Sequence, residues 1–468
     1  MARTIIDKLW DDHLVANLDN GTSLLYIDRV FLHERTGSVT LKELAAAKRR
    51  VRDPGQVFCT MDHIVDTFPG RGDATRMPGG TEFITQTRAA AQAAGITLFD
   101  IGDERQGIVH VVSPEQGIAL PGVTLVCPDS HTCTLGGLGA LAWGIGSTEA
   151  EHALATKTLV VRRPRSMRIN FTGRLAPGVG AKDLIMALIG AHTASGGVGY
   201  VIEFAGEAIR ALPVEGRLTL CNMGVEFGAW TVIIAPDDTV YEYVQGRPYA
   251  PRGEVLERAI DYWRGLPSDA DARFDKEIAL DCSRLAPQVS WGTSPQHETG
   301  IDGVVPDPAG EADANRRQSM ERAQAYMGLQ PGTPLAGLPI QGAFIGSCTN
   351  SRLSDLRAAA EVLKGRKVAS GVRAICVPGS TQVKRAAERE GLDKVFLEAG
   401  FEWRESGCSM CFYAGGESFG FEERVVSSTN RNFENRQGPH TRTHIASPVT
   451  VAASAIAGRL ADARSIAG

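Results

Sequence analysis

The sequence predicts an α/β fold built on parallel sheets, and three observations support this. Apolar strand-like segments alternate with helical segments through the last third of the chain. Polar loops follow apolar strands directly, as at Met61-Asp62-His63, which is where open α/β sheets place their binding sites. The chain has 468 residues, 43% of them hydrophobic and 22% charged, which is enough for two to four domains with an ample core.

Composition narrows the class of protein. A net charge of −5 gives no reason to expect a nucleic-acid partner. Nine cysteines, an odd number spread over a long chain, argue against a disulfide framework and for a reducing compartment. The start of the chain lacks the apolar core of a signal peptide, and no apolar run reaches the length of a membrane span. We therefore expect a cytoplasmic enzyme that binds neither nucleic acid nor membrane.

A first α/β domain is expected over residues 1–165. Its predicted elements are an initial helix, a strand at 24–27, a helix before Arg49, a strand at 57–59, a helix at 81–94, and strands at 97–99 and 123–126. The glycines between Gly136 and Gly146 are expected to lie in a helix of small residues. Their spacing does not complete the GxGxxG nucleotide-binding pattern, so close packing of this segment on a strand is the preferred interpretation.

A second α/β domain is expected over residues 166–290. The basic run that opens it, from Arg162 to Arg168, is interpreted as a solvated connector, with phosphate binding as the alternative. A helix at 181–189, a strand at 201–204 and a helix at 218–227 are predicted to follow. Asn222 and Glu226 are four residues apart and would share one face of that last helix, either as a structural pair or facing a site.

A third α/β domain is expected over residues 291–468, with 291–330 partly a connecting segment. The stretch 293–313 is rich in Gly, Pro and Asp and is predicted to be exposed. A helix at 314–327 comes next, and then strands at 342–345, 373–377 and 425–427 alternate with helices at 353–363, 381–390 and 448–457. The polar loops after the strands at 123–126 and 342–345 resemble each other, which suggests two α/β domains facing one cleft.

The most informative motif is a C-x-x-C pair, Cys408 and Cys411, together with a lone Cys348 that follows an apolar strand. A C-x-x-C pair alone is more often a zinc site, a redox pair or a buried structural pair than a cluster site. Three cysteines leave one position of a tetrahedral zinc site or of a cubane without a ligand. An iron left open in this way is a Lewis acid for substrate, whereas an electron carrier would require a fourth ligand. The helix expected after Cys348 should lower the pKa of its thiol.

Three further segments accompany these cysteines: Gly-Ser-Cys-Thr-Asn-Ser at 346–351, Pro-Asp-Ser-His-Thr at 128–132, and Ser-Thr-Asn-Arg-Asn-Phe-Glu-Asn-Arg-Gln-Gly at 428–438. With them the chain resembles the aconitase superfamily, and within it the large subunits of 3-isopropylmalate dehydratases, from about Thr4 to about Arg459. The resemblance implies an aconitase-like fold, with three α/β domains and parallel or mixed sheets around a central iron–sulfur cleft.

The resemblance also implies an activity, that of a hydro-lyase which interconverts 2- and 3-isopropylmalate in leucine biosynthesis. A dehydratase acting on 2-methylmalate/citraconate or on homoaconitate is the alternative within the same class. An RNA-binding regulator of the aconitase type is the alternative from another class. The acidic balance of the chain argues against that regulator.

Residue roles follow from the resemblance as expectations. The cluster ligands of a [4Fe-4S] group with one iron not ligated by protein would be Cys348, Cys408 and Cys411. The catalytic carboxylate–imidazole pairs would be Asp62 with His63, Asp129 with His110, and Glu226 with His131. The substrate-binding residues would be Arg431, Arg436, Ser130, Asn222 and Asn430. An imidazole tethered to a carboxylate can protonate a leaving hydroxyl, and arginine forks suit carboxylate oxygens.

In that family the base is a serine, flanked by arginines, on a separate swivelling domain, and no segment of this chain resembles that domain. The resemblance therefore implies a small-subunit partner, with a small substituted malate as substrate. The sequence departs from the family pattern at Phe412–Ser418 and at Trp230. Either departure could reshape the pocket, so the substituent on the malate stays open. The six cysteines outside the motif are expected to be dispensable: Cys59, Cys127, Cys133, Cys221, Cys282 and Cys376.

Overall fold

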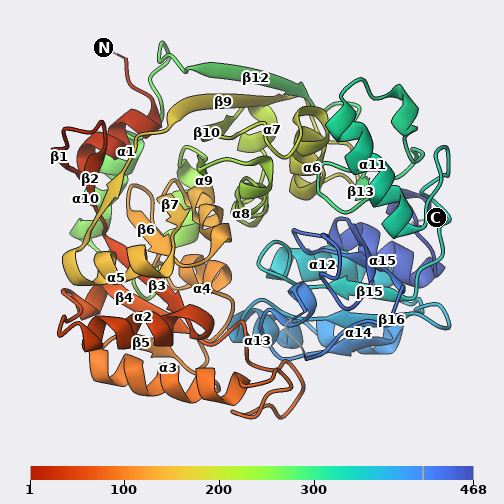
Figure 1. Cartoon of the computed structure of the whole chain (residues 1–468), viewed down its shortest axis with the longest axis horizontal. Coiled ribbons are helices and arrows are strands. Elements are labelled where there is room, and N and C mark those ends of the chain that lie inside the picture. The colour runs from red at the N-terminus through yellow and green to blue at the C-terminus, as the bar shows by residue number, and fades with distance from the viewer. Residues whose placement is uncertain (1, 414–415, 467–468) are drawn as a thin grey trace.

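Two five-stranded parallel sheets face each other across the molecule. The computed structural model describes residues 2–413 and 416–466. The first sheet has the order β5-β4-β3-β6-β7, with β3 Arg29–His33, β4 Val57–Thr60, β5 Thr97–Phe99, β6 Thr124–Cys127 and β7 Leu141–Gly144. The second has the order β17-β16-β15-β18-β19, with β15 Gly342–Ile345, β16 Arg373–Cys376, β17 Phe401–Trp403, β18 Arg424–Ser427 and β19 Arg442–Ile445. Figure 1 shows the first sheet at the left in red and orange, and the second at the lower right in blue.

The two sheets share one topology. In each, the first strand lies at the centre, the next two are added on one side and the last two on the other, and neighbouring strands are parallel. The strand order therefore reverses between β3 and β6, and again between β15 and β18. Ligand crevices form at such reversals, beyond the carboxyl ends of the strands. We therefore expect a binding site at the loops after these four strands.

The loop resemblance noted in the sequence links the two five-stranded sheets, although the two loops do not hold equivalent places in them. It paired the loop after β6 with the loop after β15, but β6 is the fourth strand of its sheet and β15 is the first of its own. The topological counterpart of β15 is β3, and that of β6 is β18. Strand β3 was not predicted, because the first fifty residues were assigned only one strand, at 24–27. A strand there, Ser23–Tyr26 (β2), belongs to a small antiparallel sheet.

A third sheet and two small antiparallel sheets complete the strands. The third sheet, of order β11-β10-β9-β12, is parallel, with β9 Arg165–Thr172, β10 Tyr200–Ala205, β11 Thr231–Ile233 and β12 Lys276–Asp281. The antiparallel sheets contain β1 Leu14–Asn17, β2 and β8 Thr158–Val161 in one, and β13 Gln288–Ser290 and β14 Glu298–Gly300 in the other. The basic run is therefore not a simple connector: β9 begins at Arg165, and Arg168 on it pairs with Glu203 on β10 at 3.0 Å.

Helices cover these sheets. The first part of the chain contains α1 Ile5–His13, α2 Glu34–Ala46, η1 Pro54–Gln56, α3 Gly80–Ala94, α4 Val109–Glu115, η2 Ser130–Leu138 and α5 Ser147–Thr156. The middle contains α6 Ala181–His192, α7 Glu207–Arg210, α8 Val214–Asn222, η3 Val225–Phe227, α9 Asp238–Val244 and α10 Glu254–Arg264. The last part contains η4 Pro308–Gly310, α11 Ala314–Met327, α12 Leu353–Leu363, α13 Thr381–Arg389, α14 Leu392–Ala399, η5 Ser409–Cys411, α15 Pro448–Ala457 and η6 Ala463–Ser465.

Three large clusters of buried apolar side chains form the core, one around each of the three parallel sheets. The first cluster also contains side chains from beyond residue 166, such as Leu218 and Val240. The predicted domain boundaries at 165 and 290 stay predictions. The segment 293–313 is less exposed than predicted, because Ile301 and Val305 are buried in the second cluster.

The glycine-rich segment after Asp129 forms a 3₁₀ helix and a strand, not the predicted helix of small residues. Gly139, at φ +83°, ends η2, and strand β7 follows. A Cβ at Gly136 would lie 1.8 Å from the carbonyl oxygen of Val232, so η2 lies directly against β11. The preferred interpretation of these glycines, close packing on a strand, therefore fits the structure.

The predicted helix at 218–227 ends early. Helix α8 stops at Asn222, and the backbone N–H of the next residue, Met223, bonds to the carbonyl of Cys221 instead of continuing the helix. Glu226 lies on the separate turn η3. Asn222 and Glu226 therefore do not share a helix face, although both lie near the site described below.

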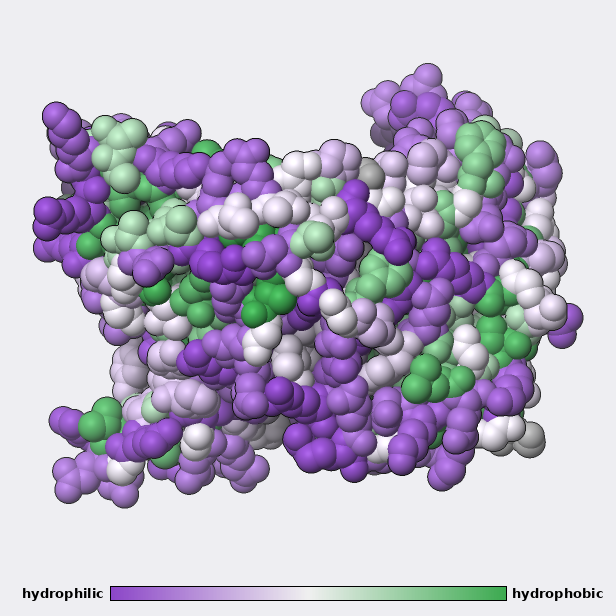
Figure 2. Space-filling view, turned by 90° about the horizontal axis from the view of Figure 1, so that it is seen from below, coloured by the Kyte–Doolittle hydropathy of each residue, from purple (hydrophilic) through white to green (hydrophobic). Residues whose placement is uncertain are grey.

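The face in Figure 2 is largely hydrophilic, with hydrophobic residues in small separate groups. Single exposed apolar side chains such as Phe421 are common on soluble proteins. Within the described residues, no helix is both long enough and apolar enough to cross a membrane.

Candidate active site

A cavity of about 340 Å³ lies where the two five-stranded sheets face each other. Its lining comes from the carboxyl ends of strands in both sheets, as their shared topology predicts. The first half of the chain contributes His33, Arg35, Thr36, His63, Ile108, His110, Pro128, Asp129, Ser130 and His131. The second half contributes Cys348, Cys408, Cys411, Phe412, Arg431 and Arg436. All three cysteines of the motif and both predicted arginines thus lie on one cavity.

The three cysteines are nearly buried and lie close together. The hydroxyl of Ser347 lies 3.2 Å from Sγ of Cys411 and 3.9 Å from Sγ of Cys348. Ser347 and Ser409, which flank the cysteines, have positive φ angles of 77° and 46°. Such left-handed conformations are rare for side chains other than glycine and concentrate at functional sites. The backbone is therefore constrained where it presents the thiols.

The spacing of the thiols does not suit a single metal ion. A zinc ion binds thiolates at about 2.3 Å, which places its sulfur ligands at most about 4.6 Å apart. Among residues 2–413 and 416–466, the group whose ligand atoms all lie within 4.8 Å of one another is His33, Glu34, Asp62 and His63, and not the three cysteines. The cysteine set leaves room for a larger group held by three thiolates, and it fits an iron–sulfur cluster better than zinc.

Side-chain N–H groups surround two of these sulfurs. The amides of Asn222 and Asn430 donate to Sγ of Cys348 at 3.2 and 3.4 Å, and Arg436 donates to Sγ of Cys411 at 3.6 Å. Hydrogen bonds of this kind stabilise thiolate and cluster sulfur. Among the described residues, the buried Oδ1 of Asn430, an acceptor, has no hydrogen-bond partner. These donors form a polar shell suited to an anionic group between the cysteines.

The expected lowering of the Cys348 pKa by a helix start is wrong for the chain without metal. Burial raises the pKa of Cys348 to about 12, and the neighbouring Cys411 adds to this. Helix α12 begins only at Leu353, too far along the chain for its dipole to offset the burial. Metal coordination itself must therefore supply the thiolate form.

His63 lies between two carboxylates. Its Nδ1 is 2.6 Å from Asp62 Oδ1, and its Nε2 is 3.2 Å from Asp129 Oδ2. Ionised carboxylates only accept hydrogen bonds, so both ring nitrogens must donate, and the ring is an imidazolium. Burial alone would lower the pKa of His63, but Asp62 and Cys408 raise it well above its usual value. The site thus stores a proton on His63.

Asp129 organises the other two imidazoles. His110 Nε2 lies 3.0 Å from Asp129 Oδ1, and the backbone N–H of His131 donates to the same oxygen at 2.7 Å as η2 begins. Burial would raise the pKa of Asp129, but His110, His131 and His63 hold it well below its usual range. Asp129 is therefore an anion shared by the imidazoles around it.

Glu226 connects the third imidazole to an arginine. Its Oε1 lies 3.1 Å from Nε2 of His131 and 2.6 Å from Nε of Arg431. Burial would raise the pKa of Glu226, but these two partners lower it. All three predicted carboxylate–imidazole pairs are thus in contact, although their catalytic roles stay predictions.

Sequence reasoning missed a group of site residues on and after β3: His33, Arg35 and Thr36 line the cavity, and Glu34 lies behind it. The available signal was the apolar run before His33, which has the same strand-then-polar-loop form as the segments that were recognised. Buried Lys182 on α6 was also missed. Its Nζ donates to the carbonyl oxygens of Ser428 and Thr429, next to Asn430 and Arg431.

The two departures from the family pattern have different outcomes. Phe412 lines the cavity, and its ring centroid lies 5.2 Å from the guanidinium carbon of Arg35 and 5.7 Å from that of Arg436. Ala414 and Gly415 lie outside the described residues. Trp230 is not part of the cavity lining, because it packs on Trp143 at 4.9 Å against the first core cluster. The residues that line the cavity therefore give no support to the expectation that Trp230 reshapes the pocket.

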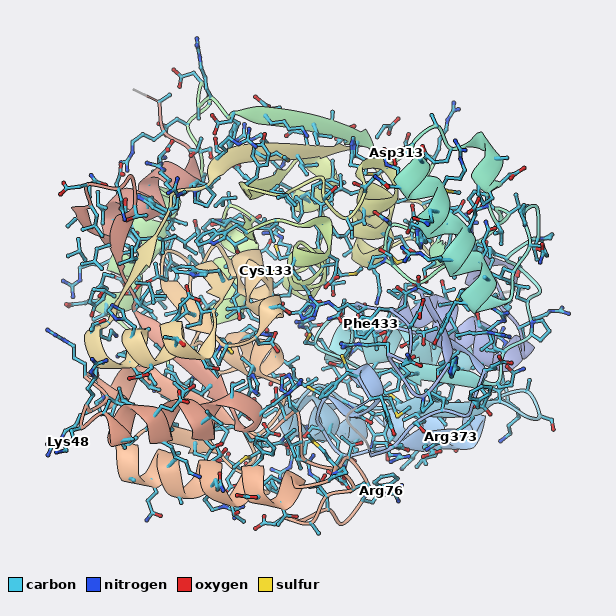
Figure 3. The ribbon with its side chains drawn as sticks, in the orientation of Figure 1. Lys48, Arg76, Cys133, Asp313, Arg373 and Phe433 are labelled. Carbon is cyan, nitrogen blue, oxygen red and sulfur yellow. The ribbon has the colours of Figure 1, made fainter. Side chains whose placement is uncertain are left out.

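The six other cysteines are all buried. Cys133, labelled in Figure 3, lies on η2, and its thiol donates to the carbonyl of Cys221 at 3.2 Å. Burial raises its pKa to about 12. None of the six is among the residues that line the cavity.

Comparisons with known proteins agree with this geometry. Residues 7–458 match the model of the Aconitase family (aconitate hydratase). Over 464 residues, which are 99% of this chain and 97% of the relative, the sequence is 55% identical to the 3-isopropylmalate dehydratase large subunit 1 of Bradyrhizobium diazoefficiens.

Proposed function

The chain belongs to the aconitase family, and from that premise we propose that it is the large subunit of an iron–sulfur hydro-lyase that interconverts 2- and 3-isopropylmalate in leucine biosynthesis. The observation that carries this proposal is the 55% identity over nearly the full length of both chains. The cavity adds chemical support, because it brings together thiols, carboxylate-paired imidazoles and arginines. The proposed location is the cytoplasm.

We assign Cys348, Cys408 and Cys411 as the residues that would hold a [4Fe-4S] cluster. When bound there, it would supply one iron without a protein ligand, which acts as a Lewis acid toward the leaving hydroxyl. Asn222 and Asn430 are assigned to orient the Cys348 sulfur, to which both donate.

The acid side of the reaction is assigned to the imidazoles. His63 borders the cavity, and its imidazolium is assigned to protonate the departing hydroxyl from Nε2, which donates to Asp129 when no substrate is bound. Asp62 and Asp129 hold the ring in place, and His110 shares the Asp129 carboxylate. His131 with Glu226 forms the remaining pair, next to Arg431.

Substrate carboxylates are assigned to Arg431 and Arg436, which border the same cavity as the thiols. Arg431 uses Nε for Glu226, which leaves its two terminal nitrogens available as a fork. Ser130, an exposed residue of the lining, is assigned to the substrate as well. The base for the carbon-bound proton is assigned to a small subunit whose swivelling domain closes over the cavity.

The test is anaerobic reconstitution of the chain together with its small subunit, followed by assays on a panel of substituted malates. The expected result is interconversion of 2- and 3-isopropylmalate at a higher kcat/KM than for 2-methylmalate or homoaconitate. A preference for 2-methylmalate or homoaconitate would overturn the assigned substrate, while the assigned reaction class would still hold. Binding of RNA on filters by the cluster-free chain, with no dehydratase activity in the loaded complex, would favour a regulator instead.

A further inference from the structure

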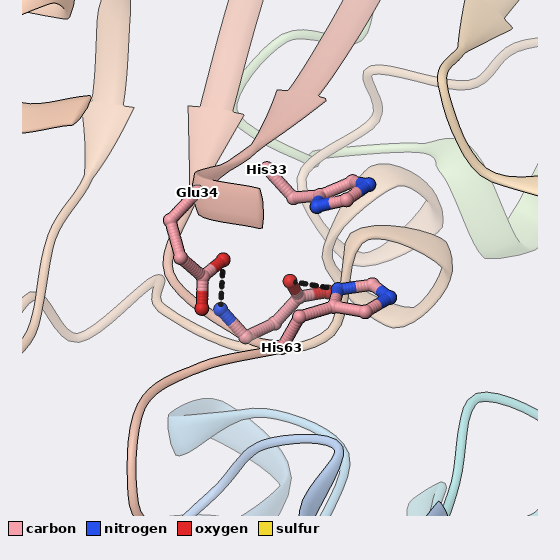
Figure 4. A group of neighbouring side chains, drawn as sticks. His33, Glu34 and His63 are labelled. Atoms are coloured by element: carbon pink, nitrogen blue, oxygen red, sulfur yellow. Dashed lines mark hydrogen bonds and ion pairs between the residues drawn. The ribbon is translucent and has the colours of Figure 1, made fainter. Parts of the chain in front are cut away.

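His33, Glu34, Asp62 and His63 form a buried group at the carboxyl ends of β3 and β4 (Figure 4). Their ligand atoms lie within 4.8 Å of one another, a spacing that suits a metal ion. The bonds within the group argue against a metal. Asp62 Oδ1 already binds His63, and both oxygens of Glu34 already accept backbone N–H groups. The group therefore calls for a different explanation.

Glu34 is fully buried and binds one short loop. Its Oε2 accepts the backbone N–H of Asp62 at 3.0 Å, and its Oε1 accepts those of Ile64 at 2.5 Å and Val65 at 3.4 Å. No cation pairs with the Glu34 carboxylate in the described part of the chain. Burial and the nearby Asp62 raise the pKa of Glu34 to about 7, and the backbone N–H groups of Ile64 and Asp62 offset part of this shift. A buried carboxylate is thus devoted to fixing the backbone of residues 62–65.

That loop connects the two halves of the site. The side chain of Asp62 holds His63 and also accepts the backbone N–H of Val109 at 3.0 Å. The carbonyl oxygen of Asp62 accepts the backbone N–H of Cys408 at 2.9 Å. A displacement of this loop would therefore move the His63 imidazole and the Cys408 thiol together.

His33 supports the same imidazole from its ring face. The rings of His33 and His63 stack with centroids 4.1 Å apart and an interplanar angle of 20°. Nε2 of His33 lies 3.2 Å from the carbonyl oxygen of Pro128, in the loop that leads to Asp129. His33 and Glu34 are adjacent in the chain, so one segment after β3 supports His63 both through its backbone and through its ring.

We propose that Glu34, with its neighbour His33, is a positioning residue that sets the placement of both the His63 imidazole and the Cys408 thiol. The proposal rests on the proposed function, because it gives His63 and Cys408 their roles in the reaction. Glu34 does not line the cavity, so it acts through the loop and not on the substrate. A misplacement of about 1 Å in a reacting group costs roughly 10²-fold in rate.

The test compares Glu34→Gln and Glu34→Ala with the matched control Asp183→Asn. Asp183 is also fully buried in the first turn of a helix, and it accepts the backbone N–H groups of Gln288 at 2.7 Å and Gly180 at 2.8 Å. None of these three residues lines the cavity. The control therefore loses the same kind of bond, but in the described residues Asp183 bonds neither to the loop at 62–65 nor to His63 or Cys408.

In the complex with the small subunit, kcat should fall by roughly 10²-fold for Glu34→Ala and by less for Glu34→Gln, while KM changes by no more than about threefold. The visible circular dichroism of the reconstituted cluster should change in both variants, because Cys408 shifts. Asp183→Asn should lower the melting temperature while leaving kcat and the spectrum as in the wild type. His33→Phe, which keeps a stacked ring, should retain more activity than His33→Ala.

A folded Glu34→Gln chain with wild-type kcat and wild-type cluster spectrum would overturn the proposal. Equal kcat losses in Glu34→Gln and Asp183→Asn would also overturn it. If the wild-type complex does not act on isopropylmalate, the proposed function fails on its own. The spectrum and iron content of the Glu34 variants, which require no turnover, then decide the positioning role separately.

Discussion

Arg431 lines the cavity, and its Nε lies 2.6 Å from the carboxylate of Glu226. Replacement by lysine keeps the charge and removes the fork, so Arg431→Lys should lose both the Glu226 contact and bidentate carboxylate binding. We expect a loss of about 2–5 kcal/mol, or roughly 30- to 4,000-fold in kcat/KM. Steady-state kinetics with the small subunit present measure this.

Arg76→Lys serves as the control for this substitution. Arg76 stacks on a phenylalanine, Phe68 at 3.8 Å, and it does not line the cavity. Its replacement should leave kcat/KM as in the wild type. Wild-type kinetics for Arg431→Lys would remove Arg431 from the substrate site.

The cysteines separate into two sets. Single replacement of Cys348, Cys408 or Cys411 by alanine should abolish the visible iron–sulfur absorbance after anaerobic reconstitution, because a cubane then keeps only two protein ligands. Cys376→Ala is the control, since its thiol lies buried within the second sheet and outside the cavity. An intact cluster spectrum in any of the three ligand variants would refute the assignment.

At the level of single residues, the sequence predicted site residues only where several motif residues lie close together in the chain. The three cysteines lie in short segments with unusual spacing, so they could be identified without a structure. Glu34 could not, because one glutamate after an apolar strand has many ordinary explanations. Its role becomes visible only when the loop at 62–65, close in space but distant in sequence, is seen to donate three backbone N–H groups to it.

At the level of elements, the end of α1 is joined to the start of β3 through His13 and Asp28. His13 Nδ1 faces the carbonyl oxygen of Leu9 at 2.7 Å, and its Nε2 faces Asp28 Oδ2 at 2.8 Å. Both partners accept, so the ring is protonated, at a helix C-terminus that favours a cation. Burial alone would lower the pKa of His13, but Asp28 and the Leu9 carbonyl raise it above 6.5.

The pair of His13 and Asp28 should make the free energy of unfolding depend on pH in a defined direction. A raised pKa in the folded state means that the stabilisation is fully present below about pH 6.5 and is lost as pH rises through the folded pKa. His13→Gln should therefore lower the melting temperature more at pH 6 than at pH 9. Exposed His152→Gln is the control. An equal or larger effect of His13→Gln at pH 9 would refute this account.

Sequence patterns located elements best in the last third of the chain, where strand-like and helical segments alternate. The helices at 314–327, 353–363 and 448–457 and the strand at 342–345 begin and end where predicted. The failures occur where tertiary packing overrides local pattern. Residues 136–146 contain helix-compatible small residues, but contact with β11 selects a 3₁₀ helix and a strand. Helix α8 likewise ends at Asn222, next to a glycine, Gly224, whose Cβ would lie 2.6 Å from Val232.

At the level of the whole molecule, the site depends on both five-stranded sheets and on a connection from the third. The first sheet supplies imidazoles and carboxylates, and the second supplies thiols and arginines. Lys182 connects α6 to the segment before Arg431 through two backbone carbonyls. This arrangement could not be derived from sequence, because the spatial relation of the sheets depends on contacts between distant segments.

The residues that line the cavity lead to the last prediction: the cluster-loaded chain without the small subunit will not turn over isopropylmalate. Within the described residues, imidazoles, a carboxylate and arginines line the cavity, and the proposal assigns them to protonating the hydroxyl and binding carboxylates, which leaves the carbon-bound proton to the base of the small subunit. Ser130 is the one serine in the lining, and its hydroxyl lies 3.4 Å from Nδ1 of His131, with no arginine bound to it in the described residues. Loss of a positioned base costs roughly 10²–10⁴-fold in rate. Assays of the cluster-loaded chain with and without the small subunit should therefore differ by at least that factor. Full activity without the partner would place the base within this chain, and Ser130→Ala would then be the first variant to measure.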